Sequence, residues 1–428
     1  MKNRLLTKAI TGLSALGLLL VASCSQGPES FKGKTLTILS MSDEFKTNKV
    51  VEDFEAATGA KVDLQVVPNE QYLNKLKPLL KTGHNVPDIF VGEAGFVKQV
   101  VNLGMSEDLS KAPYNADTKD QYAYADQMGR DNEGVLRALT WQTTPGGLFY
   151  RRSIANAVFG TDDPDKIGAK FATWDDFLAS GKVLASKGYF LLPNAGDLGN
   201  VFFAQKKVPY FDKTNHWQLD PIIKTFFDVA KKVRDGGMDA KLGAWSAPWM
   251  DGMNTKPGSA KIFSYLWPTW GLFFVMNGQK NSIGDWHVTE TPGGWYWGGT
   301  WMNIYKKSPN KALAWAFIKM MTQDKDYIKK YALRTGDFNS DKVVDQEIVG
   351  NFDKGDPAGV LGGQNHYAFF LKSADKIDAS GVSADDTVIN GLVSNVLGDY
   401  LDGKIPSVDA AMAEITNRVK QQFPQATY

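Results

Sequence analysis

The sequence has very little cysteine and histidine and almost no net charge. Its 428 residues include 1 Cys and 4 His, and the formal net charge is +1 at pH 7. One cysteine cannot form a disulfide within the chain, and so few thiols and imidazoles argue against a metal site of the Cys/His type. A near-neutral chain also has no strong field to hold nucleic acid or an anionic membrane surface. We therefore expect no metal, no cofactor and no nucleic-acid partner.

Familiar enzyme signatures and long apolar spans are missing too. The sequence contains no GxGxxG, Walker-type, HExxH or GxSxG motif, so it carries no recognisable nucleotide-binding or hydrolase signature. The uncharged stretch at residues 9–23 is about 15 residues long, short of the roughly 20 that a membrane-spanning helix needs. The overall composition is ordinary, with 43% hydrophobic and 22% charged residues, which is enough for large cores.

The N-terminus has the pattern of an export signal. Three basic residues, Lys2, Arg4 and Lys8, precede the apolar stretch, as in secretory signals. The end of that stretch, Val21-Ala22-Ser23-Cys24, resembles the bacterial lipobox, which implies that Cys24 becomes the first mature residue and is acylated. Residues 1–23 are then a signal peptide, and residues 24–34 are a polar tether. We expect an extracytoplasmic protein anchored by lipid to the cell membrane; the alternative is a plain secretory signal with a coincidental cysteine.

The first hundred residues alternate strands and helices. Residues 35–39, 61–67 and 87–91 have strand patterns, and residues 48–58 and 71–82 have helical ones. This order predicts a parallel sheet in an α/β domain. Ligands bind beyond the carboxyl ends of such strands, where Glu44 follows the first strand and Glu93 the third. We expect both carboxylates near one cleft; the alternative is that each is a solvated loop residue or a helix-cap partner.

Tryptophan is abundant and concentrated. Eight of the 12 Trp residues lie between Trp245 and Trp301. Trp295 and Trp297 stand among glycines, which leave their rings uncovered, and Trp267 shares a strand face with two other aromatic residues. Flat rings suit the C–H face of a pyranose, while carboxylates and amides satisfy its hydroxyls. The alternative is that several of these residues belong to the core.

Helix signals recur through the rest of the chain. Thr173 has capping chemistry for the helix that follows it, and residues 221–235 form an amphipathic helix ended by two glycines. Ser308 and Pro309 predict a helix start, with Ser308 as N-cap. Two more helices are expected at residues 386–399 and 409–422.

Several segments, in order along the chain, resemble a known family. They are residues 87–90 (PDIF), 141–150 (WQTTPGGLFY), 298–301 (GGTW) with 308–311 (SPNK), and 408–411 (VDAA). With the lipobox, they resemble the maltose-binding-protein-like, carbohydrate-specific solute-binding lipoproteins of bacterial ABC importers. The resemblance covers essentially the whole mature chain and depends on the ordered set, because each segment alone is a weak signal.

The resemblance implies a periplasmic-binding-protein-like fold of type II, with two discontinuous α/β lobes joined by a hinge and the ligand bound between them. The first lobe would comprise residues 35–143 and 299–345, and the second residues 144–298 and 346–428. It also implies a set of residues that face the ligand. Those on the first lobe and hinge are Glu44, Glu93, Trp141, Gln142 and Thr144, and those on the second lobe are Trp267 and Trp295, with Asp197, Trp245, Trp249 and Trp297 as further candidates.

One position departs from the family pattern. Many relatives have Asp after the crossover tryptophan, where this chain has Gln142. Gln can donate as well as accept a hydrogen bond, so we expect the pattern of sugar hydroxyls that is recognised there to differ from that in relatives.

The sequence therefore predicts a monomeric binding protein, not an enzyme. It would capture a mono- to oligosaccharide by hinge closure and deliver it to the transmembrane subunits of an ABC permease. Two alternatives stay open: a secreted glycoside hydrolase, and a carbohydrate-binding adhesin or sensor lipoprotein. Against the hydrolase, Glu44 and Glu93 are predicted on the same lobe, and the sequence gives no ground to expect carboxyl groups with raised pKa values.

Overall fold

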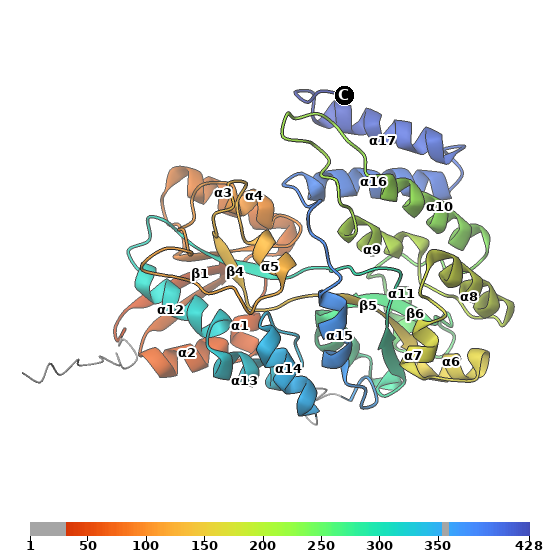
Figure 1. Ribbon diagram of the computed structural model, residues 1–428, viewed down its shortest axis with the longest axis horizontal. Helices are drawn as coiled ribbons and strands as arrows, with labels where there is room; N and C mark the ends of the chain where they lie inside the picture. Colours follow the sequence, from red (N-terminus) through yellow and green to blue (C-terminus); the bar gives the residue numbers. More distant parts are fainter. Residues whose placement is uncertain (1–30, 353–358) are drawn as a thin grey trace, which may run out of the picture.

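The computed structural model describes residues 31–352 and 359–428. It consists of two α/β lobes side by side (Figure 1). The signal peptide, Cys24 and most of the tether lie outside the described residues. Within the part of the chain that is described, no helix is both long and apolar enough to cross a membrane.

The first lobe contains a five-stranded sheet that begins as predicted. Strands β1 (Thr35–Ser40), β2 (Lys61–Val66) and β3 (Ile89–Glu93) are parallel. Helices α2 (Val50–Thr58) and α3 (Asn69–Thr82) connect them, and α3 contains Pro78. The third strand lies two residues later than predicted, because its pairing with a later strand extends to Glu93.

Two strands from later in the chain complete this sheet. Strand β8 (Thr300–Ile304) lies antiparallel between β3 and β4 (Ala138–Thr140), which gives the order β2-β1-β3-β8-β4. The sheet is therefore mixed and not purely parallel. This long-range pairing makes the first lobe discontinuous in sequence.

The second lobe contains a three-stranded antiparallel sheet. Its order is β6 (Ser264–Pro268), β5 (Gly146–Arg151) and β7 (Trp286–Thr289). Two separate clusters of buried apolar side chains lie around the two sheets. The prediction of two discontinuous α/β lobes is confirmed.

Helices cover both sheets, and those of the first lobe lie on the left in Figure 1. The remaining helices of the first half of the chain are α1 (Glu44–Thr47), α4 (Val97–Val101), α5 (Ala123–Met128), α6 (Arg152–Phe159), α7 (Pro164–Gly168), α8 (Trp174–Ser186), η1 (Ala195–Leu198) and α9 (Gly199–Ala204). Those of the second half are α10 (Pro221–Asp235), α11 (Ala247–Met253), η2 (Gly271–Val275), η3 (Met276–Gly278), η4 (Lys280–Ser282), α12 (Lys311–Thr322), α13 (Lys325–Thr335), α14 (Lys342–Gly350), α15 (His366–Ala374), α16 (Asp386–Leu401) and α17 (Val408–Gln422).

Of the two predicted helix caps, one is confirmed and one is wrong. The Thr173 hydroxyl caps α8 by accepting the Asp176 N–H, as predicted. Ser308 does not cap α12, which begins at Lys311. The Ser308 oxygen accepts the Asn310 N–H at 2.9 Å in the turn before the helix, and its hydroxyl donates to Asp88, 220 residues earlier in the chain, at 2.6 Å.

Three chain segments cross between the lobes and bond to one another. Gln142 pairs with Asn339, and Pro145 pairs with Tyr296, as isolated antiparallel bridges. The Thr143 hydroxyl also donates to the Asn339 carbonyl at 2.7 Å. These segments, near residues 141–146, 295–300 and 335–341, form the hinge region; the lobe boundaries given above remain a prediction.

Candidate binding cleft between the lobes

Five tryptophans of the second lobe form one aromatic cluster. The rings of Trp267 and Trp297 are stacked, with centroids 5.6 Å apart and planes within 4° of parallel. Trp245 and Trp270 are also stacked, at 6.4 Å and 8°. Trp249 contacts Trp245 and Trp267. Five of the eight tryptophans that are concentrated in the sequence thus form one cluster in space.

The outer layer of this cluster is accessible. Trp245 is 51% exposed, and Trp270 and Trp297 are half-buried. Trp245 also has φ of +65°, a left-handed conformation that is unusual for a bulky residue and that concentrates at functional sites. Trp267 is fully buried behind them. Trp270 was not among the predicted residues. Its position three residues after Trp267 was the one feature of the sequence that could have indicated it.

Asp197 lies behind the cluster and holds one of its rings. Its carboxylate accepts a hydrogen bond from the Trp249 indole N–H at 3.2 Å. Burial raises the pKa of Asp197 to about 7. In this structure Asp197 positions Trp249, which is itself buried.

Trp295 does not present its ring to the cleft. It is fully buried, and a Cβ added at Gly146 would lie 2.1 Å from the Trp295 ring. Gly146 therefore lets the indole pack directly on the backbone of β5. The neighbouring glycines were expected to leave the ring uncovered, but β5 covers it, and contact of Trp295 with a ligand stays a prediction.

The predicted residues of the first crossover are also buried, and they contact other parts of the protein. Trp141 is 2% exposed and packs on Phe45, with ring centroids 4.8 Å apart. The Thr144 hydroxyl donates to the Gly298 carbonyl at 2.9 Å, and its backbone N–H donates to the Tyr124 hydroxyl. Gln142 is also buried. These residues hold the hinge region in this structure, and their contact with a ligand remains a prediction.

Glu44 lies where the strand order predicted, just after β1. Its carboxylate accepts a hydrogen bond from the Ser42 hydroxyl at 3.3 Å, and burial raises its pKa to about 7. Burial and the neighbouring charge of Glu44 raise the pKa of Asp337 well above its usual value. One oxygen of Asp337 is buried without a hydrogen-bond partner among the described residues. Asp337 had no sequence signal, because only the third crossover brings it to Glu44.

Glu93 lies at the end of β3 and lines a hollow between the lobes. Its carboxylate accepts the backbone N–H of Gly95 at 2.7 Å, and burial raises its pKa to about 7. The hollow has a volume of about 240 Å³. Its other walls come from both lobes and include Gly95, Asn200, Phe203, Tyr296, Trp297, Asp386, Thr387 and Asn390.

The raised pKa values of Glu44 and Glu93 were not expected from the sequence. They arise because each carboxylate is buried near the end of a strand, and burial disfavours the charged form. A partly protonated carboxyl group can donate as well as accept a hydrogen bond near neutral pH. This suits recognition of a hydroxyl, which also does both.

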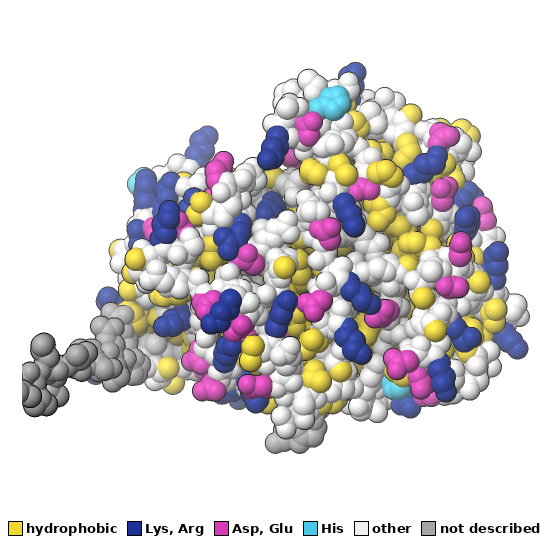
Figure 2. All heavy atoms as spheres, viewed as in Figure 1, with side chains coloured by type: hydrophobic (Ala, Val, Ile, Leu, Met, Phe, Trp, Pro, Cys, Tyr) yellow, Lys and Arg dark blue, Asp and Glu magenta, His cyan; other side chains and the backbone are white. Residues whose placement is uncertain are grey.

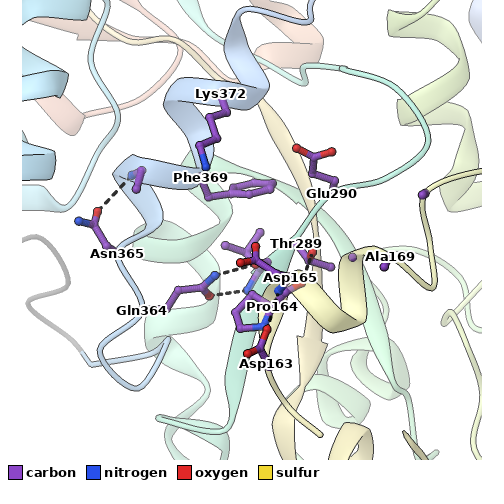
Figure 3. Close-up of a pocket in the computed structure, with 14 residues that line it drawn as sticks. Asp163, Pro164, Asp165, Ala169, Thr289, Glu290, Gln364, Asn365, Phe369 and Lys372 are labelled. Carbon is purple, nitrogen blue, oxygen red and sulfur yellow. Dashed lines mark hydrogen bonds between the residues drawn. The ribbon is translucent and has the colours of Figure 1, made fainter.

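Two other hollows lie near this region. One, of about 630 Å³, lies between Asn48 and Arg334 of the first lobe and Phe273 and Lys280 of the second. Another, of about 560 Å³, lies within the second lobe between α7, β7 and α15 (Figure 3). In it, the Gln364 amide bonds both the N–H and the carbonyl of Val288 on the edge strand β7. It contains none of the predicted ligand-facing residues.

The surface agrees with the near-neutral composition. On the face shown in Figure 2, acidic and basic side chains are interspersed, and the surface is notched where the lobes meet at the top of the view. Within the described residues, no group of three or more His, Cys, Asp or Glu side chains is arranged to hold a metal ion.

Comparison with known proteins gives one family and one fold. The sequence pattern of the family described as "Bacterial extracellular solute-binding protein" matches residues 49–353. None of the curated proteins compared with the sequence matches it.

Solved structures agree over nearly the whole chain. A family 1 extracellular solute-binding protein has 18% identity and a TM-score of 0.77, covering 91% of this chain and 99% of its own. An ABC transporter associated binding protein from B. animalis subsp. lactis, in complex with beta-1,6-galactobiose, has 22% identity and a TM-score of 0.72. The sugar-binding protein MalE from Xanthomonas citri has 17% identity and a TM-score of 0.72. The last two each cover 92% of this chain and 98% of their own.

At these identities the structural likeness establishes the fold, and the predicted type II periplasmic-binding-protein architecture is confirmed. The family match places the protein outside the cytoplasm. Since that match extends over most of the chain, this protein belongs to the bacterial extracellular solute-binding protein family.

Proposed function

We propose that the protein captures a sugar between its lobes and delivers it, unaltered, to an ABC import permease. The observation that carries this proposal is the pairing of aromatic and polar groups across the cleft. Trp297 and Glu93 border the same inter-lobe hollow, and the exposed ring of Trp245 and the half-buried ring of Trp270 lie beside Trp297. This combination matches the two kinds of surface that a pyranose ring presents.

The chemistry of the hollow fits a neutral polyol. The indole face of Trp297 can contact the C–H face of a sugar, while Glu93, Asn200 and Asn390 can bond its hydroxyls. The volume of about 240 Å³ is below the ~300–1,000 Å³ usual for ligand pockets. We infer a short saccharide, or one end of a longer one.

The relatives support the same assignment. The structure from B. animalis subsp. lactis is a complex with a galactobiose, and the one from Xanthomonas citri is called a sugar-binding protein. Capture of a sugar for import is thus the function most consistent with the family, the fold and the aromatic cleft together.

We further propose that Cys24 is acylated and that the protein acts as a monomer near its permease. One acyl chain binds a membrane only marginally, and two or more bind stably. Radiolabelled palmitate should therefore enter the wild-type chain in cells and should not enter a Cys24→Ser variant. Equal labelling of both chains would contradict acylation at Cys24.

A panel of neutral mono-, di- and trisaccharides tests the capture directly. Thermal shift should identify at least one sugar that raises the unfolding temperature, and calorimetry should then give its affinity. Chromatography of the incubated sugar should show no new product.

The panel also separates the hydrolase alternative, since a glycosidase needs one protonated carboxyl group and a second, ionised one, whereas burial raises the pKa of both Glu44 and Glu93. Release of smaller sugars, abolished by Glu44→Gln or Glu93→Gln, would show that the protein is a hydrolase. No shift with any sugar would contradict sugar capture.

A further inference from the structure

We propose that a contact between α16 and the segment after β3 is a latch that holds the lobes together before any solute binds. The latch consists of two hydrogen bonds between side chains of one lobe and backbone carbonyls of the other. They lie near the second crossover, whose Gly299 carbonyl accepts the Ala94 N–H at 3.0 Å. The Thr387 hydroxyl donates to the Gly95 carbonyl, and the Gln99 amide donates to the Ala384 carbonyl at 2.8 Å. Gly95 and Gln99 belong to the first lobe, whereas Ala384 and Thr387 belong to the second. The inference holds whichever solute the protein carries.

The first lobe presents its half of the latch in a fixed orientation. The Lys77 ammonium donates to the Gln99 side-chain oxygen at 2.9 Å, so the amide NH₂ is the end that points to the other lobe. At Gly95, an added Cβ would lie 3.2 Å from the Thr387 hydroxyl and 2.9 Å from the Glu93 carboxylate. The absence of a side chain there allows α16 to approach the backbone closely.

The second lobe holds its half in place through a buried lysine. Lys206 is 1% exposed and donates to the Gly381 carbonyl, and its ammonium lies 3.4 Å from the Asp386 carboxylate. The Ser383 hydroxyl also donates to Asp386, at 2.6 Å. The segment from Gly381 to the start of α16 is therefore already ordered, and forming the latch fixes few additional torsions. Figure 1 shows this end of α16 facing the first lobe near α4.

The latch acts on the loop that also carries a predicted ligand contact. Gly95, whose carbonyl Thr387 binds, donates its own N–H to Glu93. Holding this loop against α16 therefore positions Glu93 in the closed arrangement. A protein that is partly closed without solute binds more tightly, since apparent affinity scales with the population of the competent state. Gln99 and Thr387 are thus positioning residues for closure.

Because Thr387 also borders the hollow, the test measures lobe separation without solute. Cys24 is replaced by Ser, and spin labels are attached at Lys75→Cys in the first lobe and Lys213→Cys in the second, both exposed positions. Pulsed electron–electron double resonance then gives the distribution of distances between the two spin labels in the sugar-free protein. The wild-type background should show a population at the short distance of this structure.

Removing the latch should deplete that population. The double variant Gln99→Met/Thr387→Val keeps side-chain volume and should lower the closed-to-open ratio by about 5- to 30-fold, as expected for two lost hydrogen bonds. Thr387→Ser, which keeps the hydroxyl, should retain the wild-type distribution.

The matched control is Gln65→Met/Thr82→Val, which removes two exposed hydrogen bonds within the first lobe and should change nothing. An unchanged distribution in the latch variant, or a wild-type protein with no short-distance population, would overturn the proposal. Sugar binding is measured separately, so failure of the latch would leave the proposed function standing, and failure to bind sugar would leave the latch standing.

Discussion

At the residue scale, the structure moves the centre of the site to Trp297. Its ring is half-exposed, is stacked on Trp267 and borders the hollow with Glu93. Trp297→Ala should weaken sugar binding by about 1–3 kcal/mol, through lost stacking and apolar contact. Calorimetry with the best sugar of the panel measures this. The control is Trp315→Ala on α12, which packs on Tyr114 away from the cleft; equal losses in both variants would contradict the assignment.

Trp295 should behave in the opposite way. It is fully buried against Gly146, so Trp295→Ala should lower the free energy of unfolding by about 3–5 kcal/mol. Chemical denaturation measures the change, with the half-exposed Trp245→Ala as a comparison that loses little stability. A stable Trp295→Ala protein with greatly weakened sugar affinity would restore Trp295 to the ligand-facing set.

Glu93 should make sugar binding depend on pH. Its pKa of about 7 in the sugar-free protein means that the carboxyl group is partly protonated near neutrality. A sugar hydroxyl that donates to the carboxylate favours the ionised form and lowers this pKa, so affinity should rise from about pH 6 to about pH 8. Glu93→Gln should flatten the profile, whereas Glu347→Gln, which loses a surface ion pair with Lys329, should keep it. Affinity that falls over this range would contradict the proposed contact.

At the scale of secondary-structure elements, Asp88 joins three of them. Its carboxylate accepts the N–H and the hydroxyl of Thr37 on β1, at 2.9 and 2.8 Å, and the hydroxyl of Ser308 before α12. Asp88→Ala would leave these donors without a partner in a buried site and should destabilise folding by about 2–5 kcal/mol. Chemical denaturation tests this, with the exposed Asp63→Ala as control. Equal stability of the two variants would contradict the role given to Asp88.

Elements with a local signal could be predicted from the sequence, and those made by distant pairing could not. Periodicity and glycine stops placed α2, α3, α10 and the early strands to within about two residues, because burial pattern and capping are local properties. The insertion of β8 between β3 and β4 has no such signal, since these partners lie about 210 and about 160 residues earlier in the chain. The prediction of Ser308 as N-cap was wrong, because the local pattern does not show that the helix begins only at Lys311, after a turn in which Ser308 bonds the distant Asp88.

The same division holds for the site. The end-of-strand rule led to Glu44 and Glu93, which do follow β1 and end β3, because that rule depends on sheet topology. Trp295 and Trp141 are buried in this structure, which the sequence could not show, because it does not tell which side of a glycine-rich segment a ring packs against. Asp337 and Trp270 were missed, because their surroundings exist only after the third crossover and the aromatic cluster have formed.

At the scale of the whole molecule, two lobes share three crossover segments and enclose aromatic and carboxylate groups between them. The backbone bridges at Gln142 and Pro145 tie the crossovers together, and the contact of Thr387 with Gly95 joins the lobes beside the inter-lobe hollow. A hinge and a contact between the lobes are the parts needed for closure around a solute.

The central claim is that an intact sugar binds between the lobes against the exposed tryptophans. A crystal structure of the protein with the best sugar of the panel tests it most directly. We expect an uncleaved sugar that contacts the ring of Trp297 or Trp270 and forms a hydrogen bond with Glu93 through one of its hydroxyls. A sugar bound elsewhere on the surface, or a cleaved product in the cleft, would contradict it.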